Sequence, residues 1–93
     1  MAYNPSQEEK GKEVTKVSSY LLPKGGLVII YRVSSLLLNG VYIATYNDNS
    51  TEMPWGCDIS VEGALLAAER EWRVFNPEAD ENPFTEVLKF LQR

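Results

Sequence analysis

The stretch GLVIIYRVSSLLLNGVYIATYN, residues 26–47, contains two runs of β-branched, aliphatic and aromatic residues that meet at Asn39-Gly40. An Asn-Gly pair between two such runs is typical of a two-residue β-hairpin turn, because both residues tolerate a positive φ. Counting outward from this turn places Val33 opposite Tyr46. The stretch therefore predicts an antiparallel hairpin in which both faces are largely apolar.

Two apolar faces need cover on both sides of the sheet. Helices of the same chain can cover one face. The second face must then meet the amino-terminal segment, a second copy of the chain or a partner protein. A homodimer is one of these arrangements and is the oligomeric state that we expect.

The amino-terminal segment has two parts. Residues 1–13 are polar and predict either a tail or the start of a helix, since Ser6 and Glu9 have the spacing of a capping box. Residues 14–22 alternate in a way that favours a strand, although Val14, Val17 and Leu21 also fit a helix. The following Pro23-Lys24-Gly25-Gly26 predicts a turn.

A long amphipathic helix is predicted after the hairpin. Residues 47–51 read as a polar turn and residues 52–57 as an irregular connection. Asp58 or Ser60 can cap the helix that follows. Its apolar stripe at helical spacing consists of Val61, Ala64, Leu65, Ala68, Trp72 and Phe75.

A second, shorter helix completes the predicted fold. Asn76-Pro77 ends the first helix, and Asn82-Pro83 supplies an N-cap followed by the residue best tolerated at the first helical position. Residues 14–93 are thus expected to form one α+β domain. Its architecture is an antiparallel hairpin or three-stranded meander packed against the long helix, followed by the short carboxy-terminal helix.

The charge is acidic and unevenly distributed. The chain has a formal net charge of −4, and residues 48–93 contain ten acidic and four basic side chains. Nucleic-acid affinity depends mainly on Lys and Arg contacts to phosphates, so no nucleic-acid partner is expected. A protein partner with a basic surface fits this charge better.

Several kinds of chemistry are excluded by composition. The chain contains no histidine and one cysteine, which removes Ser-His and Cys-His pairs, Cys-X-X-Cys motifs and imidazole zinc sites. Cys57, just before the long helix, is the best remaining nucleophile, but a semi-buried packing role is favoured. We expect no enzyme activity, no catalytic residues, no metal and no cofactor.

The compartment is also constrained. The first residues lack the apolar run of a secretory signal, and no apolar stretch is long enough to cross a bilayer. We expect a cytoplasmic protein that makes no membrane contact.

Two sets of residues are candidates for binding. Trp55, beside Met53 in a loop, is a candidate recognition residue because Trp is enriched at binding hot spots, although its ring could instead plug the end of the sheet. The acidic cluster of Glu78, Asp80 and Glu81 could occlude a basic site on a partner. These five residues form the predicted protein-binding site.

The alternative is a small-molecule binding protein, most simply a dimer that encloses an apolar pocket. Such a pocket would lie between the sheet and the long helix and would be lined by aromatic residues. The candidates are Tyr31, Tyr42, Tyr46 and Trp72.

In residues 27–75, strands come first, then the segment Pro54-Trp55-Gly56-Cys57, and then a helix that begins Ser60-Val61-Glu62. This order of elements resembles that of the HicB antitoxins. The chain departs from that pattern in its short link from Cys57 to Ser60 and in lacking a basic DNA-binding extension. The resemblance implies paired strands covered by a helix and an antitoxin-like role. With the charge and the missing catalytic groups, it favours an inhibitor, antitoxin or immunity-type interaction protein.

Overall fold

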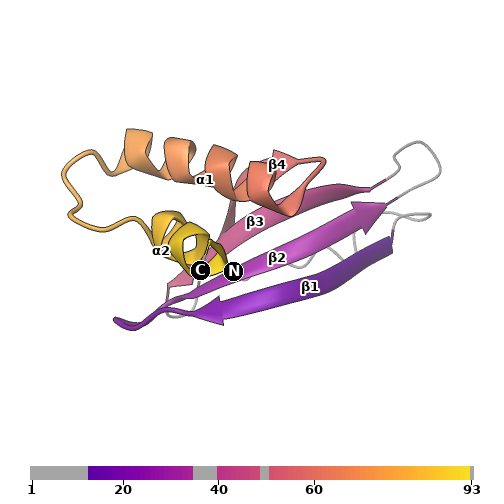
Figure 1. Ribbon diagram of the computed structural model, residues 1–93, viewed down its shortest axis with the longest axis horizontal. Coiled ribbons are helices and arrows are strands. Elements are labelled where there is room, and N and C mark those ends of the chain that lie inside the picture. The colour runs from indigo at the N-terminus through magenta and orange to yellow at the C-terminus, as the bar shows by residue number, and fades with distance from the viewer. Residues whose placement is uncertain (1–12, 35–39, 49–50, 93) are drawn as a thin grey trace.

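The computed structural model describes residues 13–34, 40–48 and 51–92, which form four strands followed by two helices. The strands are β1 (Glu13–Leu21), β2 (Leu27–Ser34), β3 (Val41–Asp48) and β4 (Thr51–Asp58); the helices are α1 (Val61–Phe75) and α2 (Pro83–Leu91). Each strand pairs antiparallel with the next, so the sheet is a meander (Figure 1). The predicted α+β class is confirmed, but the described sheet has four strands where the sequence indicated two or three.

The first strand, β1, confirms the strand interpretation of residues 14–22. It begins one residue earlier, at Glu13, while residues 1–12 and their expected tail or helix lie outside the described residues. In the turn to β2, the Leu22 N–H donates to the Gly26 carbonyl oxygen at 3.0 Å. Gly26 has a φ of 91°, a conformation that glycine adopts without strain. The predicted turn is therefore present.

The pairing of β2 with β3 shows that the predicted hairpin register is wrong. Val33 lies opposite Val41 and not opposite Tyr46, a shift of five residues along β3. An odd shift exchanges the side chains that share a face of the sheet. Both faces are apolar, so the hydrophobic pattern specifies the register only weakly and helix packing selects it. Residues 35–39, which include most of the expected turn, lie outside the described residues.

The segment expected to be a connection is the edge strand β4. Pro54 is compatible with this position because an edge strand has one side on which a missing N–H breaks no ladder bond. The pairing skips Trp55: Ala44 lies opposite Gly56 and Thr45 opposite Pro54. Trp55 is therefore the extra residue of a β-bulge, which breaks the strict alternation by which strands are recognised in sequence.

Both helices begin where the sequence predicts. The Ser60 hydroxyl caps α1 by accepting a hydrogen bond from the Gly63 N–H at 3.0 Å. The Asn82 side chain caps α2, and Pro83 is the first helical residue. In the predicted α1 stripe the central residues are buried, whereas Phe75 at its end is exposed.

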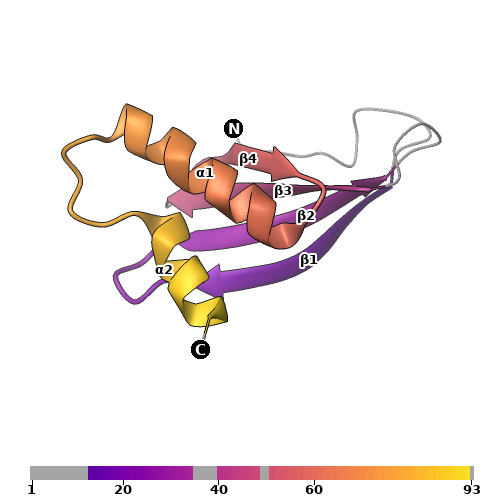
Figure 2. The ribbon, with the colours of Figure 1, turned by 45° about the horizontal axis from the view of Figure 1, so that its top comes forward.

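The core lies on one side of the sheet. Figure 2 shows α1 and α2 on the same face, with α1 along β4 and β3, and α2 beside α1. Gly56 allows this close approach, because a Cβ there would overlap the Ala64 carbonyl oxygen and the Ala68 nitrogen. The buried core consists of Val28, Ile30, Ala44, Ala64, Leu65, Ala68, Phe84, Val87 and Leu88.

The opposite face of the sheet carries buried residues of its own. Ile29 and Val33 are almost fully buried there. The Thr45 hydroxyl lies 2.9 Å from a carboxylate oxygen of Glu52 and 3.2 Å from the Ile29 carbonyl oxygen, and its single proton can be donated to either. Because β1 extends the sheet edgewise, residues 14–21 are not the cover for this face.

Candidate functional site

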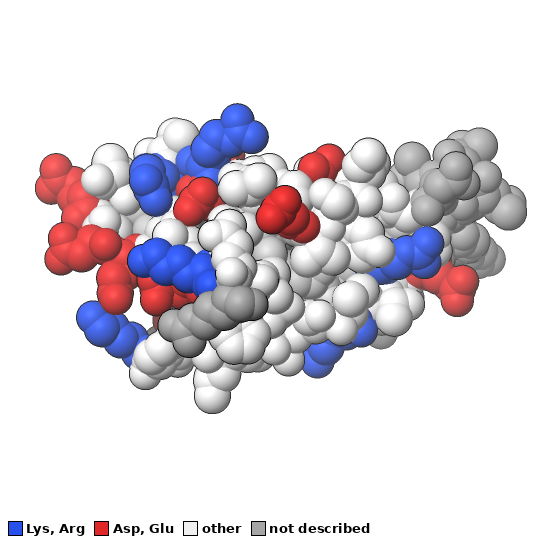
Figure 3. All heavy atoms as spheres, viewed as in Figure 1, with Lys and Arg blue, Asp and Glu red and all other residues white. Residues whose placement is uncertain are grey.

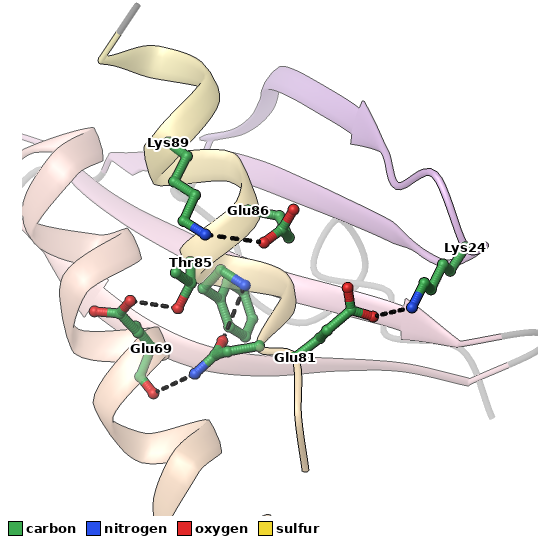
Figure 4. Close-up of polar contacts among 8 residues, drawn as sticks. Lys24, Glu69, Glu81, Thr85, Glu86 and Lys89 are labelled. Atoms are coloured by element: carbon green, nitrogen blue, oxygen red, sulfur yellow. Dashed lines mark hydrogen bonds and ion pairs between the residues drawn. The ribbon is translucent and has the colours of Figure 1, made fainter.

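The junction between α1 and α2 holds an acidic loop at one end of the molecule. The Asn82 amide donates to the Glu69 carbonyl oxygen at 2.9 Å, while its own oxygen accepts from the Phe84 N–H at 3.0 Å (Figure 4). The Thr85 hydroxyl also donates to the Glu69 carboxylate. These bonds join the start of α2 to the side of α1, so both ends of the intervening loop are anchored.

The acidic loop itself is exposed. Glu78, Asp80 and Glu81 all have exposed side chains, and Figure 3 shows carboxylates gathered at the end of the molecule where this loop lies. Glu81 pairs with Lys24 of the β1–β2 turn at 2.9 Å. Because both partners are exposed, this ion pair contributes at most about 1 kcal/mol. Glu78 and Asp80 present their charge outward.

An aromatic pair lies at the same end of α1. The half-buried Trp55 ring packs edge to face against Phe75, with centroids 5.7 Å apart. Phe75 is the last residue of α1, three positions before Glu78, and its side chain is 65% exposed. Phe75 therefore connects the predicted residue Trp55 with the acidic loop. We call Trp55, Phe75, Glu78, Asp80 and Glu81 the acidic-aromatic surface.

Trp55 is partly buried and partly accessible. Its ring packs partly against the core, and it also borders a shallow hollow of about 330 Å³ with Ile43, Pro54, Gly56 and Cys57. Met53, the other predicted apolar contact, lies on β4 with its side chain about half exposed. The hollow and Met53 add exposed apolar surface to the β4 edge of the sheet.

Phe75 is the residue of this surface that sequence reasoning missed. Its position in the apolar stripe predicted burial. At the last turn of α1, however, where Asn76 forms the C-cap, Phe75 contacts the Trp55 ring of β4 and remains 65% exposed. The signal that could have identified Phe75 is its position next to the C-cap, because the last residue of an apolar helix stripe often has little of the sheet to pack against.

The four aromatic residues of the predicted small-molecule pocket do not gather at one place. Tyr42, Tyr46 and Trp72 pack against the core under the helices. Tyr31 lies opposite Ile43 in the register, on the other face of the sheet. Tyr46 and Trp72 alone border a common groove of about 240 Å³, which also touches Lys24 and Glu81.

Cys57 lies in β4, outside α1, whose N-cap is Ser60. Its side chain is exposed. Partial burial of the thiol and the neighbouring Asp58 carboxylate raise the pKa of Cys57 above its ordinary value. A raised pKa lowers the thiolate fraction at neutral pH, which is opposite to the activation a nucleophile needs.

A larger groove of about 460 Å³ separates the end of β1 from α2. It is bordered by Tyr20 and Leu21 on the strand side and by Val87, Lys89 and Phe90 on the helix side. The rings of Tyr20 and Phe90 meet edge to face across it, with centroids 6.0 Å apart. No residue of this groove is among the binding candidates predicted from the sequence.

Within the described ranges, no three or more Cys, Asp and Glu side chains cluster in a way that could hold a metal ion. No helix in the described part of the chain has the length and hydropathy to span a membrane.

Comparison with known proteins gives no match to any family model, to any curated protein or to any solved structure. The resemblance to the HicB antitoxins therefore depends on the quoted motif alone.

Proposed function

We propose that this protein is a non-enzymatic interaction module that binds a partner protein through the acidic-aromatic surface. The observation that carries this proposal is the exposed Phe75 ring, which packs edge to face against Trp55 and lies three residues before Glu78 of the acidic loop. An inhibitor, antitoxin or immunity-type role in the cytoplasm, acting by occlusion of a basic site, is the form of activity that we infer.

The aromatic pair has the properties of a binding anchor. Aromatic side chains dominate interface energetics because they bury a large apolar area at a low cost in conformational entropy. Phe75 is held by the Trp55 ring and so loses little further freedom when a partner covers it. A partner would need an apolar pocket facing this ring.

The acidic loop selects the charge of the partner. Carboxylates at the rim of an interface attract and orient a basic surface, and their effect falls as the salt concentration rises. Glu78 and Asp80 are exposed and follow Phe75 by three and five positions, so they can form such a rim. The partner is therefore expected to place Lys or Arg around the pocket that receives Phe75.

The test starts with affinity capture from lysate on the immobilised full chain, followed by titration calorimetry with the captured partner. Phe75→Ala should weaken the affinity at least about tenfold, the effect of losing a hot-spot aromatic residue. Glu78→Lys should weaken it mainly at low salt. Val74→Ala is the matched control, because Val74 precedes Phe75 and is 69% exposed. Equal effects of the Phe75 and Val74 variants would refute this binding surface.

The small-molecule alternative has less support. Two of its four aromatic residues, Tyr46 and Trp72, share the 240 Å³ groove, whereas Tyr31 lies on the far face of the sheet.

A further inference from the structure

The two edges of the described sheet differ in how open they are to another strand. On β4, Pro54 and the bulge at Trp55 interrupt the strand, and α1 packs along it. Proline, bulges and covering helices are the devices by which proteins block edge pairing. The nine residues of β1 contain no proline, and no described strand pairs with its outer edge.

The β1 edge adjoins exposed apolar surface. A bulge at Val17 divides the strand and leaves Ser18–Leu21 as a regular segment beside the 460 Å³ groove. Leu21 is 80% exposed, and Val17, Phe90 and Leu91 are also exposed. The edge therefore offers backbone groups for pairing and apolar side chains for burial at the same place.

The charges at this edge allow self-association. The whole chain has a net charge of −4, but β1 and α2 together carry two acidic and two basic side chains: Glu13, Lys16, Glu86 and Lys89. Two copies can thus approach here without the repulsion that the acidic loop would produce.

We propose that β1 is the interface with a second copy of this chain, in which the two β1 strands pair antiparallel about a two-fold axis at Ser19. This register places Tyr20 opposite Ser18 of the other copy, so that side chains on the helix side face one another. It also brings the exposed Val17 and Leu21 together. In this register only Ser19 lies opposite the same residue of the other copy. No charged side chain of β1 therefore faces its identical partner, and the strand is self-complementary.

The consequence is a continuous sheet with an α2 helix from each copy beside the central strands. Phe90 and the groove would then face their symmetry mates and lose their exposure to solvent. This interface and the Trp55–Phe75 pair lie at opposite edges of the sheet, so neither proposal depends on the other.

Sedimentation velocity of the full chain, from about 1 µM to about 1 mM, tests this interface over the range of weak to moderate dimer affinities. We expect a species of twice the monomer mass of 10.5 kDa. Leu21→Glu should raise the dimer dissociation constant at least about 100-fold, because in this register it buries an unpaired charge opposite the apolar Val17 of the other copy. Ile59→Glu is the matched control: Ile59 is equally exposed, at 80%, and lies beyond β4.

Phe90→Glu provides a second variant on α2, also at an exposed position, with folding checked by far-UV circular dichroism. A wild-type chain that sediments as a monomer over the whole range would overturn the proposal. So would equal effects of Leu21→Glu and Ile59→Glu on the dissociation constant.

Discussion

Gly56 is the residue on which the contact between α1 and the sheet depends most directly. A Cβ at this position would overlap backbone atoms of Ala64 and Ala68. Backbone cannot rotate away as a flexible side chain can, so α1 would have to move off β4.

Gly56→Ala is therefore expected to lower the free energy of unfolding by at least about 2 kcal/mol, as measured by urea denaturation. Gly63→Ala is a suitable contrast, because the atoms nearest its Cβ would be side-chain atoms, those of the Asp58 carboxylate and the Ser60 hydroxyl, and not the backbone of another element. The better helix propensity of alanine offsets part of that cost by about 1 kcal/mol. If the two variants were equally stable, the close packing of α1 on β4 would be wrong.

The structural role of Gly56 cannot be recognised from the sequence. The sequence places Gly56 in an irregular connection, and its role depends on a helix that packs across it. The burial of Glu52 against Thr45 could not be predicted either, because Glu is rarely buried without a partner and that partner comes from another strand. Residue pairs made by tertiary packing leave no local pattern.

At the scale of elements, local sequence signals predict where the helices begin, whereas the register and extent of the strands depend on packing between elements. Ser60 and Asn82-Pro83 mark helix starts that follow from hydrogen bonds within a few residues. The β2–β3 register depends on which face of the sheet the helices cover. Strand β4 is hard to recognise in the sequence because Pro54 and the bulge at Trp55 interrupt its alternating pattern. The sequence predicts the acidic loop because turn-forming residues flank it on both sides. It does not predict the groove beside β1, because that groove lies between β1 and α2, which are far apart in the chain.

Asn82 joins α1 to α2 through two hydrogen bonds, and substitutions can separate their contributions. Asn82→Ala loses the cap and the bond to Glu69 and should cost about 2 kcal/mol of unfolding free energy. Asn82→Ser keeps a capping oxygen but is too short to reach the Glu69 carbonyl, so about 1 kcal/mol is expected. Ser60→Ala, which removes only the cap of α1, should also cost about 1 kcal/mol.

Thermal and urea unfolding of these three variants measure the differences. If Asn82→Ala were no worse than Ser60→Ala, the bond from Asn82 to Glu69 would contribute nothing to the helix junction.

At the scale of the whole molecule, the Trp55–Phe75 pair and the proposed dimer interface lie at opposite edges of one sheet, while Glu81 of the acidic loop reaches Lys24 in the β1–β2 turn. β1 is the nearly neutral edge, while β4 lies beside the Trp55–Phe75 pair and the end of α1. A dimer formed through β1 would keep both β4 edges at its outer ends. Each copy could then bind a partner without contacting the other.

This separation predicts that the two activities respond to different substitutions. The wild-type dimer should bind two partner molecules, and the monomeric Leu21→Glu variant should bind one, with a site affinity unchanged to within about twofold, as expected for distant sites. Phe75→Ala should weaken partner binding and leave the dimer dissociation constant unchanged. Sedimentation of a fluorescently labelled partner with each variant measures stoichiometry and affinity together. A tenfold or greater loss of partner affinity in Leu21→Glu would instead mean that one partner molecule contacts both copies, because only a shared site couples partner binding to the β1 interface.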